Sequence, residues 1–177
     1  METTKIILCG RRCVGKTTLY WDLQKALNWP MFSVSEYLRS IIHRHNLKSQ
    51  EQIDAKNTEI SNDLNDRIDN LLTTSDHIII DTRFYYRIQE KFGSTLKILL
   101  TASEKVRLER AAYREGTSVE IQRKRLIKKE DEWIAKMSKI YPFDFFDPKN
   151  FDLVIDTGNL TPKQVNETVI EVVRRKL

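Results

Sequence analysis

Short apolar runs recur along the chain and predict buried β-strands. The five runs are 5–9, 31–34, 77–81, 96–100 and 153–156. Each is too short for a typical helix, and most are apolar throughout. Continuous apolar runs are typical of strands covered on both faces, as in a parallel sheet. The pattern therefore predicts a five-stranded parallel sheet.

Helical periodicity fills the intervals between these runs. Leu19 and Leu23 recur at helical spacing, and Ser33 with Glu36 has the spacing of a capping box that opens the next helix. A longer amphipathic helix is expected from about Ser49, and another at the C-terminal end. Because strands and helices alternate, the fold class is α/β, and we predict a three-layer α/β/α sandwich.

Length and composition fit one compact domain. The chain has 177 residues, of which 40% are hydrophobic, and no linker divides it, so we expect a single domain over 1–177. The net charge of +5 suits phosphate-rich small molecules as well as nucleic acid. The chain runs from Met1 into the first predicted strand without room for a signal peptide, and no apolar run is long enough to cross a bilayer. We therefore expect a cytoplasmic protein in which Cys9 and Cys13 are reduced.

The stretch IILCGRRCVGKTTLY at residues 6–20 contains a complete phosphate-binding motif. Gly10 is followed after four residues by Gly15, Lys16 and Thr17, which matches G-x-x-x-x-G-K-[ST]. A predicted strand precedes the motif and a predicted helix follows it, as in a P-loop. Backbone N–H groups of such a loop hold a polyphosphate, so we predict ATP binding. The residues predicted to bind ATP here are Gly10, Arg11, Arg12, Cys13, Val14, Gly15, Lys16, Thr17 and Thr18.

Three residues fit the chemistry of ATP with Mg²⁺. Lys16 is expected to reach the β- and γ-phosphates, and Thr17 to ligate the Mg²⁺ that bridges them. Asp81 ends the third predicted strand, where P-loop proteins usually carry an acidic residue for the metal; it is otherwise a strand-terminal cap. The chain lacks the Asn-Lys-x-Asp and Asp-x-x-Gly motifs of GTPases and is too short for a helicase, which leaves a small phosphotransferase.

Later segments resemble the compact cytidylate kinase-like family of nucleoside monophosphate kinases. These segments are 33–39, 81–83, 107–116, and Tyr141 followed by 151–157, and the similarity runs nearly end to end. The resemblance implies acceptor-binding helices over about 33–72 and a short helical lid over about 114–136. It also implies transfer of a phosphoryl group from ATP to CMP or dCMP, or to UMP, giving ADP and the diphosphate.

The resemblance implies roles for individual arginines. Arg39 and Arg83 resemble the pair that grips the acceptor's phosphate, for which guanidinium geometry is well suited. Arg110 resembles the residue that packs over the adenine, and Arg114 the lid arginine that follows the migrating phosphoryl group. The implied catalytic residues are Lys16, Arg110, Arg114 and Lys136; Thr157, Gly158 and Asn159 border the adenine; and Ser33, Tyr37, Arg39 and Arg83 bind the acceptor.

The charged run 107–139 departs from the family pattern at two positions. Lys129 and Lys136 stand where the family usually has arginine, so the charge is kept and the bidentate fork is lost. The run mixes both signs on a helical pattern, which predicts two solvated helices.

Two other functions stay open from the sequence. One is a kinase for a small hydroxyl acceptor, with Asp81 as the base. The other is a nucleotide-gated module that binds RNA or a partner through a basic patch where the lid is expected. That patch comprises Arg123, Lys124, Arg125, Lys128 and Lys129. The leading interpretation instead expects small nucleotide substrates, no membrane, no stable nucleic-acid partner, and a monomer or weak dimer.

Overall fold

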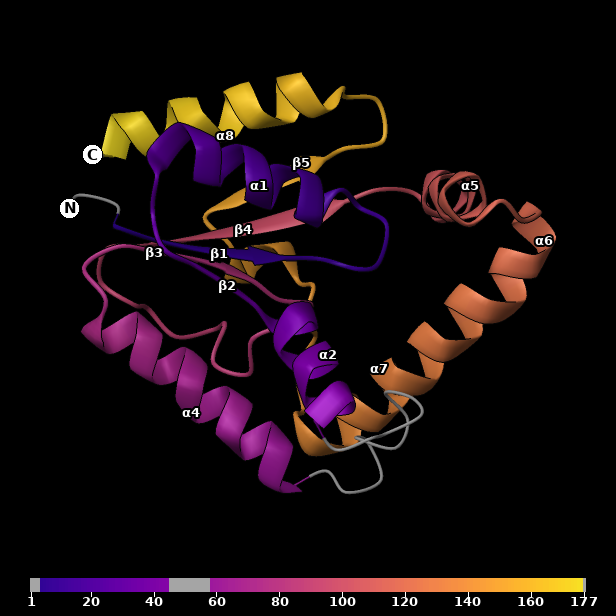
Figure 1. The fold of residues 1–177 in the computed structure, drawn as a ribbon, viewed down its shortest axis with the longest axis horizontal. Coiled ribbons are helices and arrows are strands. Elements are labelled where there is room, and N and C mark those ends of the chain that lie inside the picture. Colours follow the sequence, from indigo (N-terminus) through magenta and orange to yellow (C-terminus); the bar gives the residue numbers. More distant parts are fainter. Residues whose placement is uncertain (1–3, 45–57, 177) are drawn as a thin grey trace.

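Five parallel strands form one sheet in a computed structural model that describes residues 4–44 and 58–176 (Figure 1). The strands are β1 (Lys5–Cys9), β2 (Met31–Ser33), β3 (Ile78–Asp81), β4 (Thr95–Thr101) and β5 (Leu153–Asp156). Their order is β2-β3-β1-β4-β5, and every pairing is parallel. The predicted five-stranded parallel sheet is confirmed. In such a sheet all carboxyl ends lie at one edge, so the residues that follow the strands meet there.

Helices cover both faces of this sheet. The described helices of the chain are α1 (Lys16–Leu27), α2 (Val34–Arg44), α4 (Thr58–Thr74), α5 (Glu104–Glu115), α6 (Val119–Gln122), α7 (Lys128–Ile140) and α8 (Pro162–Lys176), with a π-helical turn η1 (Arg123–Ile127) and a 3₁₀ turn η2 (Pro148–Asn150). Figure 1 shows α1 and α8 on one side of the sheet and α2 and α4 on the other. The three-layer α/β/α sandwich is confirmed, whereas the predicted start of the long helix near Ser49 lies outside the described residues.

Two separate apolar layers hold the sandwich together. Leu23 of α1 and Val169 of α8 pack on the sheet face that carries Ile6 and Leu8. The opposite face packs against α2, α4 and the segment that follows α7, with Ile68 of α4 fully covered. Burial of this apolar surface is the main force that fixes the strand ends relative to one another.

Local signals end and begin elements where the sequence predicts. The Ser33 hydroxyl accepts a hydrogen bond from the Glu36 backbone N–H at 3.4 Å and opens α2. Thr161 and Gln164 form a complete capping box in front of α8, with Gln164 Oε1 accepting from the Thr161 N–H at 2.9 Å. At Gly10 a Cβ atom would lie 2.4 Å from the Leu100 carbonyl oxygen, so only glycine lets β1 turn this close to β4.

The charged segment after α5 forms a long arm. We call α6, η1 and α7 (residues 119–140) the lid arm; it leaves the end of α5 and runs back toward α2 (Figure 1). The prediction of solvated helices is wrong for three polar residues of this region, because Arg107, Gln122 and Glu130 are buried. Within the part of the chain that the structure describes, no helix has the length and apolar character of a membrane span.

Candidate active site

The P-loop curls around the ammonium group of Lys16. The Lys16 Nζ donates hydrogen bonds to the Gly10 carbonyl at 2.9 Å and to the Arg11 carbonyl at 3.0 Å. Burial lowers the pKa of Lys16, and the carboxylate of Asp81 opposes this shift. The ammonium group of Lys16 thus lies at the centre of the loop, next to the first turn of α1, where anions are stabilised.

A cavity of about 340 Å³ opens beside this loop. It is lined by Cys13, Val14, Gly15, Lys16, Thr17, Thr18, Leu19, Arg110, Arg114, Thr157, Leu160, Pro162 and Val165. The structure thus gathers most residues predicted for the ATP site around one space, which we call the P-loop cavity. The sequence analysis missed Leu160, Pro162 and Val165, although their place after β5 and in the first turn of α8 was a usable signal.

Arg110 is held firmly at the wall of the P-loop cavity. Its Nη1 donates to Thr157 Oγ1 at 2.9 Å, and its Nη2 donates to the Thr157 carbonyl at 2.6 Å. The same Nη1 lies 3.3 Å from the Cys13 carbonyl oxygen. Arg114, one turn further along α5, is exposed and pairs with Glu115 at 3.3 Å. The first arginine is fixed, while the second is on the solvent side of the cavity.

Some predicted residues do not line the P-loop cavity. Gly10, Arg12, Gly158 and Asn159 lie in the loops around it, and Gly158 donates its N–H to Asp156 Oδ1 at 2.8 Å. Arg11 lines a different hollow, of about 450 Å³, where its guanidinium lies 5.1 Å from the Phe146 ring centroid.

Asp81 carries a buried carboxylate at the end of β3. Its Oδ2 accepts a hydrogen bond from Ser33 Oγ at 3.5 Å, and its Oδ1 is buried without a hydrogen-bond partner among the described residues. Burial raises the pKa of Asp81, while Lys16 and Ser33 act in the opposite direction. A buried carboxylate oxygen without a partner fits a hard divalent cation or a water bound to it.

The donor set fits a cation that also binds phosphate. Thr17 is an exposed residue in the first turn of α1, and Asp81 supplies one carboxylate. The described residues form no group of three or more histidine, cysteine or acidic side chains that could hold a metal ion by themselves. Mg²⁺ typically keeps several waters and takes one or two carboxylates together with phosphate oxygens.

The predicted acceptor residues come from β2, α2 and the end of β3. Ser33 is buried, whereas Arg39 is exposed and donates to the Ser35 carbonyl at 3.2 Å. The Arg83 guanidinium lies 4.7 Å from the ring centroid of Trp133 on α7. The Trp133 ring therefore connects the strand end that carries Arg83 to the lid arm.

Tyr37 is engaged by α4 in a way that the sequence analysis did not predict. Its hydroxyl donates to Asp63, and the Arg67 guanidinium lies 5.3 Å from its ring centroid and 5.4 Å from that of Phe32. The usable signal was the spacing of Asp63 and Arg67, four residues apart on one helix face. This contact joins α2 to α4, so the two predicted acceptor helices form one unit.

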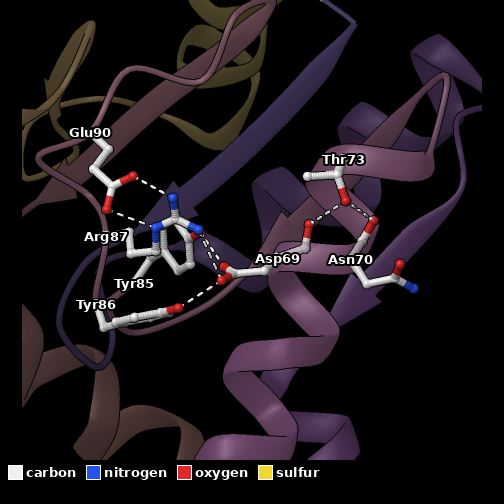
Figure 2. A network of polar contacts seen from close by, with 7 residues as sticks. All are labelled: Asp69, Asn70, Thr73, Tyr85, Tyr86, Arg87 and Glu90. Atoms are coloured by element: carbon white, nitrogen blue, oxygen red, sulfur yellow. Dashed lines mark hydrogen bonds and ion pairs between the residues drawn. The ribbon is translucent and has the colours of Figure 1, made fainter.

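A second contact joins α4 to the loop after β3 (Figure 2). The Asp69 carboxylate accepts hydrogen bonds from the hydroxyls of Tyr85 and Tyr86 and from Arg87 Nη1 at 3.0 Å. Arg87 also forms an ion pair with Glu90. This loop directly follows Arg83, so the network fixes the chain that carries a predicted acceptor residue.

The lid arm carries the remaining predicted catalytic residue and the basic patch. Lys136 is exposed on α7. Arg123 pairs with Glu104, and Lys124 lies 3.7 Å from Glu120. Much of the positive charge of this patch is therefore balanced by neighbouring carboxylates.

Comparison with known families identifies the class of protein. The sequence model of a family described as an AAA domain matches residues 6–134. The chain therefore belongs to the AAA domain family, and it is similar over nearly its whole length to cytidylate kinases.

Curated relatives include cytidylate kinases and a nucleotide dehydratase. The cytidylate kinase of Sulfolobus acidocaldarius is 27% identical over 174 residues, which cover 97% of this chain and 95% of the relative. That of Haloarcula marismortui is 25% identical over 170 residues, covering 95% of this chain and 88% of the relative. The S-adenosylmethionine-dependent nucleotide dehydratase of Lacinutrix mariniflava is 32% identical over 174 residues, covering 95% of this chain. This chain spans only 35% of the dehydratase.

Solved structures support the fold. An uncharacterized protein from Eubacterium ventriosum superimposes with a TM-score of 0.74 at 16% identity, covering 97% of this chain and 99% of that one. Shikimate kinase from Bacteroides thetaiotaomicron superimposes with a TM-score of 0.63 at 14% identity, covering 97% and 98%. The chain thus has the fold of small P-loop kinases.

Proposed function

We propose that this protein transfers the γ-phosphoryl group of ATP to a nucleoside monophosphate, with CMP or dCMP as the preferred acceptor and UMP as the next. The observation that carries the proposal is the P-loop cavity, where Lys16, Arg110 and Arg114 line one space. Transfer between two phosphates concentrates negative charge, and cations from separate segments are what such a reaction needs. The cytidylate kinases that match nearly the whole chain support the choice of acceptor.

In this proposal the residues act by position and charge. Lys16 leaves its loop carbonyls to neutralise the β- and γ-phosphates, and Arg110 contacts the donor from a place fixed by Thr157. Arg114 follows the phosphoryl group as it moves. Thr17 and Asp81, directly or through water, would hold Mg²⁺, which would offset the negative charge of the phosphates. Arg39 and Arg83 grip the acceptor's phosphate.

The acceptor's chemistry removes the need for a base. A nucleoside monophosphate has a second pKa of about 6 and is already anionic at neutral pH. Asp81 is 5% exposed, and one of its oxygens accepts a hydrogen bond from Ser33. These features favour a metal-binding role for Asp81 over the role of a base for a hydroxyl acceptor.

The test is a panel of all ribo- and deoxyribonucleoside monophosphates incubated with ATP and Mg²⁺. We expect ADP and one diphosphate to form in equal amounts, fastest with CMP or dCMP. A panel that includes small hydroxyl acceptors tests the other kinase class, and salt-sensitive RNA binding without phosphotransfer would support the binding module. No diphosphate from any monophosphate, in a protein that binds ATP, would contradict the proposal.

A role in nucleotide dehydration is favoured by one comparison. The 174 residues that align with the dehydratase of Lacinutrix mariniflava cover 95% of this chain. We propose that the phosphorylated nucleotide made by this chain is used by a nucleotide dehydratase. The test is to supply that relative with each product of the panel, together with S-adenosylmethionine. Faster consumption of the phosphorylated product than of its monophosphate is expected, and the reverse order would contradict the proposal.

A further inference from the structure

One buried carboxylate joins three parts of the active site. The side chain of Glu130, on α7 of the lid arm, is 1% exposed. Its Oε2 accepts from Arg107 Nη1 of α5 at 2.6 Å and from Arg11 Nη1 at 3.4 Å. Its Oε1 accepts from the backbone N–H of Arg12 at 3.2 Å. Both oxygens are thus used, and two of the three donors belong to the P-loop.

The backbone of Arg12 is held at both of its polar groups. Its N–H donates to Glu130, and its carbonyl accepts from Arg107 Nη1 at 3.4 Å. The next residue, Cys13, has a φ of 64°, a backbone angle that residues other than glycine seldom adopt. A backbone conformation of this kind persists only where the surroundings enforce it. The Glu130 and Arg107 side chains supply such a constraint next to the P-loop cavity.

The charge on Glu130 is stabilised where it lies. Burial acts against the charged form, but the hydrogen bond from Arg107 and the positive charges of Arg107 and Arg11, with the Arg12 N–H, lower the pKa of Glu130. The carboxylate therefore stays ionised and keeps its acceptor capacity at neutral pH.

We propose that Glu130 is a positioning residue that holds the P-loop in its nucleotide-binding shape and couples it to the lid arm. Movement of α7 carries Glu130 with it and so changes the constraint on the Arg12 backbone. The link to phosphoryl transfer rests on the proposed function, whereas the effect on nucleotide binding does not.

A purely structural ion pair makes a different prediction. If Glu130 served only to neutralise Arg107, its loss would lower the melting temperature and leave the folded protein with normal ATP affinity and turnover. If it positions the loop, the folded variant binds ATP less tightly and turns over more slowly. The two possibilities separate when the measurements are made well below the melting temperature.

The experiment compares Glu130→Gln with a control on the same helix. Glu132→Gln makes the same chemical change at an exposed position, where the carboxylate lies 4.0 Å from Lys128. For Glu130→Gln we expect the Kd for ATP to rise about tenfold, as for a lost hydrogen bond to a charged group. The kcat with the preferred acceptor should fall about 10²-fold through misplacement of the loop. The control should match the parent within about twofold.

A double variant keeps the test decisive where Glu130→Gln folds poorly. In Arg107→Met/Glu130→Met the buried pair is replaced by apolar side chains, which often preserves stability. The Arg12 N–H nevertheless loses its acceptor, so we expect a melting temperature near the parent's with the same loss of ATP affinity. A folded double variant with the parent's Kd and kcat, or loss of folding in both variants, would assign the pair a structural role and overturn the proposal.

The same measurements separate this proposal from the proposed function. A parent that binds ATP but phosphorylates no monophosphate contradicts the function, and the ATP affinity of the variants still tests Glu130. A parent that is an active kinase, with variants that bind ATP normally and turn over normally, contradicts the role of Glu130 alone.

Discussion

Arg110 and Thr157, which lie 47 residues apart in the chain, are joined by two hydrogen bonds from one guanidinium group. The Thr157 hydroxyl also donates a hydrogen bond to the Val14 carbonyl of the P-loop at 2.9 Å. The wall of the P-loop cavity is thus one network that connects α5, the loop after β5 and the P-loop. A guanidinium group that is held in place in this way would lose little side-chain entropy on binding a ligand.

Replacing Arg110 with lysine tests this network. The Arg110→Lys variant keeps the charge but cannot donate to both Thr157 oxygens, so we expect the KM for ATP to rise about tenfold while the KM for the acceptor stays unchanged. Steady-state kinetics with each substrate varied in turn gives both values. Glu109→Gln, an exposed neighbour on α5, is the control. An equal rise in both KM values would show that the network does not act on the donor alone.

Removal of the Lys16 ammonium should abolish turnover without loss of fold. We expect Lys16→Ala to lower kcat by at least about 10²-fold, because the charge that stabilises the transferring phosphoryl group is lost. Burial lowers the pKa of Lys16, which means that the folded protein holds this charge at a cost. Circular dichroism and thermal unfolding should therefore show no loss of stability. Parental kcat in a folded variant would disprove the mechanism.

Asp81 should raise kcat and lower the stability of the fold in the absence of metal. Burial raises the pKa of Asp81 above its ordinary value near 3.8. The folded state therefore holds the proton more tightly than the unfolded state, so this contribution to the free energy of unfolding is complete below the ordinary pKa and is lost as the pH rises through the raised one.

The neutral variant Asp81→Asn removes that pH dependence. At pH 7 to 8, without Mg²⁺, we expect it to melt higher than the parent, by about 2–4 °C for each kcal/mol gained, and to lose this advantage near pH 4. With Mg²⁺ and ATP we expect kcat to fall. Thermal unfolding across this pH range with EDTA provides the measurement, and a variant that melts lower at neutral pH would contradict the prediction.

The parts predicted from sequence are those encoded locally. The strand of residues 153–156 has the predicted limits, and Ser33 caps α2 as its spacing indicates. Gly10, Gly15 and Lys16 specify the P-loop by type and spacing alone, because a phosphate nest needs only backbone N–H groups and small residues. Such features depend on neighbours within a few positions of the chain.

The contacts that join distant segments were not predictable from one sequence. Glu130 meets Arg12 across 118 residues, and Asp69 meets Tyr85 across 16. A charged residue on a helical pattern has the same local signature whether it is solvated or buried, and only the partner from another element decides. Arg107 in a mixed charge run is the clearest example, since it is 4% exposed in the structure.

The Asp69 network should control the acceptor side of the site and not the donor side. Three donors converge on this carboxylate, including the hydroxyl of Tyr85, which is 1% exposed (Figure 2). In Asp69→Asn one acceptor oxygen and the charge are lost, so we expect the free energy of unfolding to fall by about 1–3 kcal/mol. The loop that follows Arg83 is then less well fixed, and the KM for the acceptor should rise several-fold while the KM for ATP stays constant.

Asp66→Asn, at an exposed position on the same helix, is the matched control. Denaturant unfolding and two-substrate kinetics supply the measurements; a loss of stability with both KM values unchanged would limit Asp69 to joining α4 to the sheet.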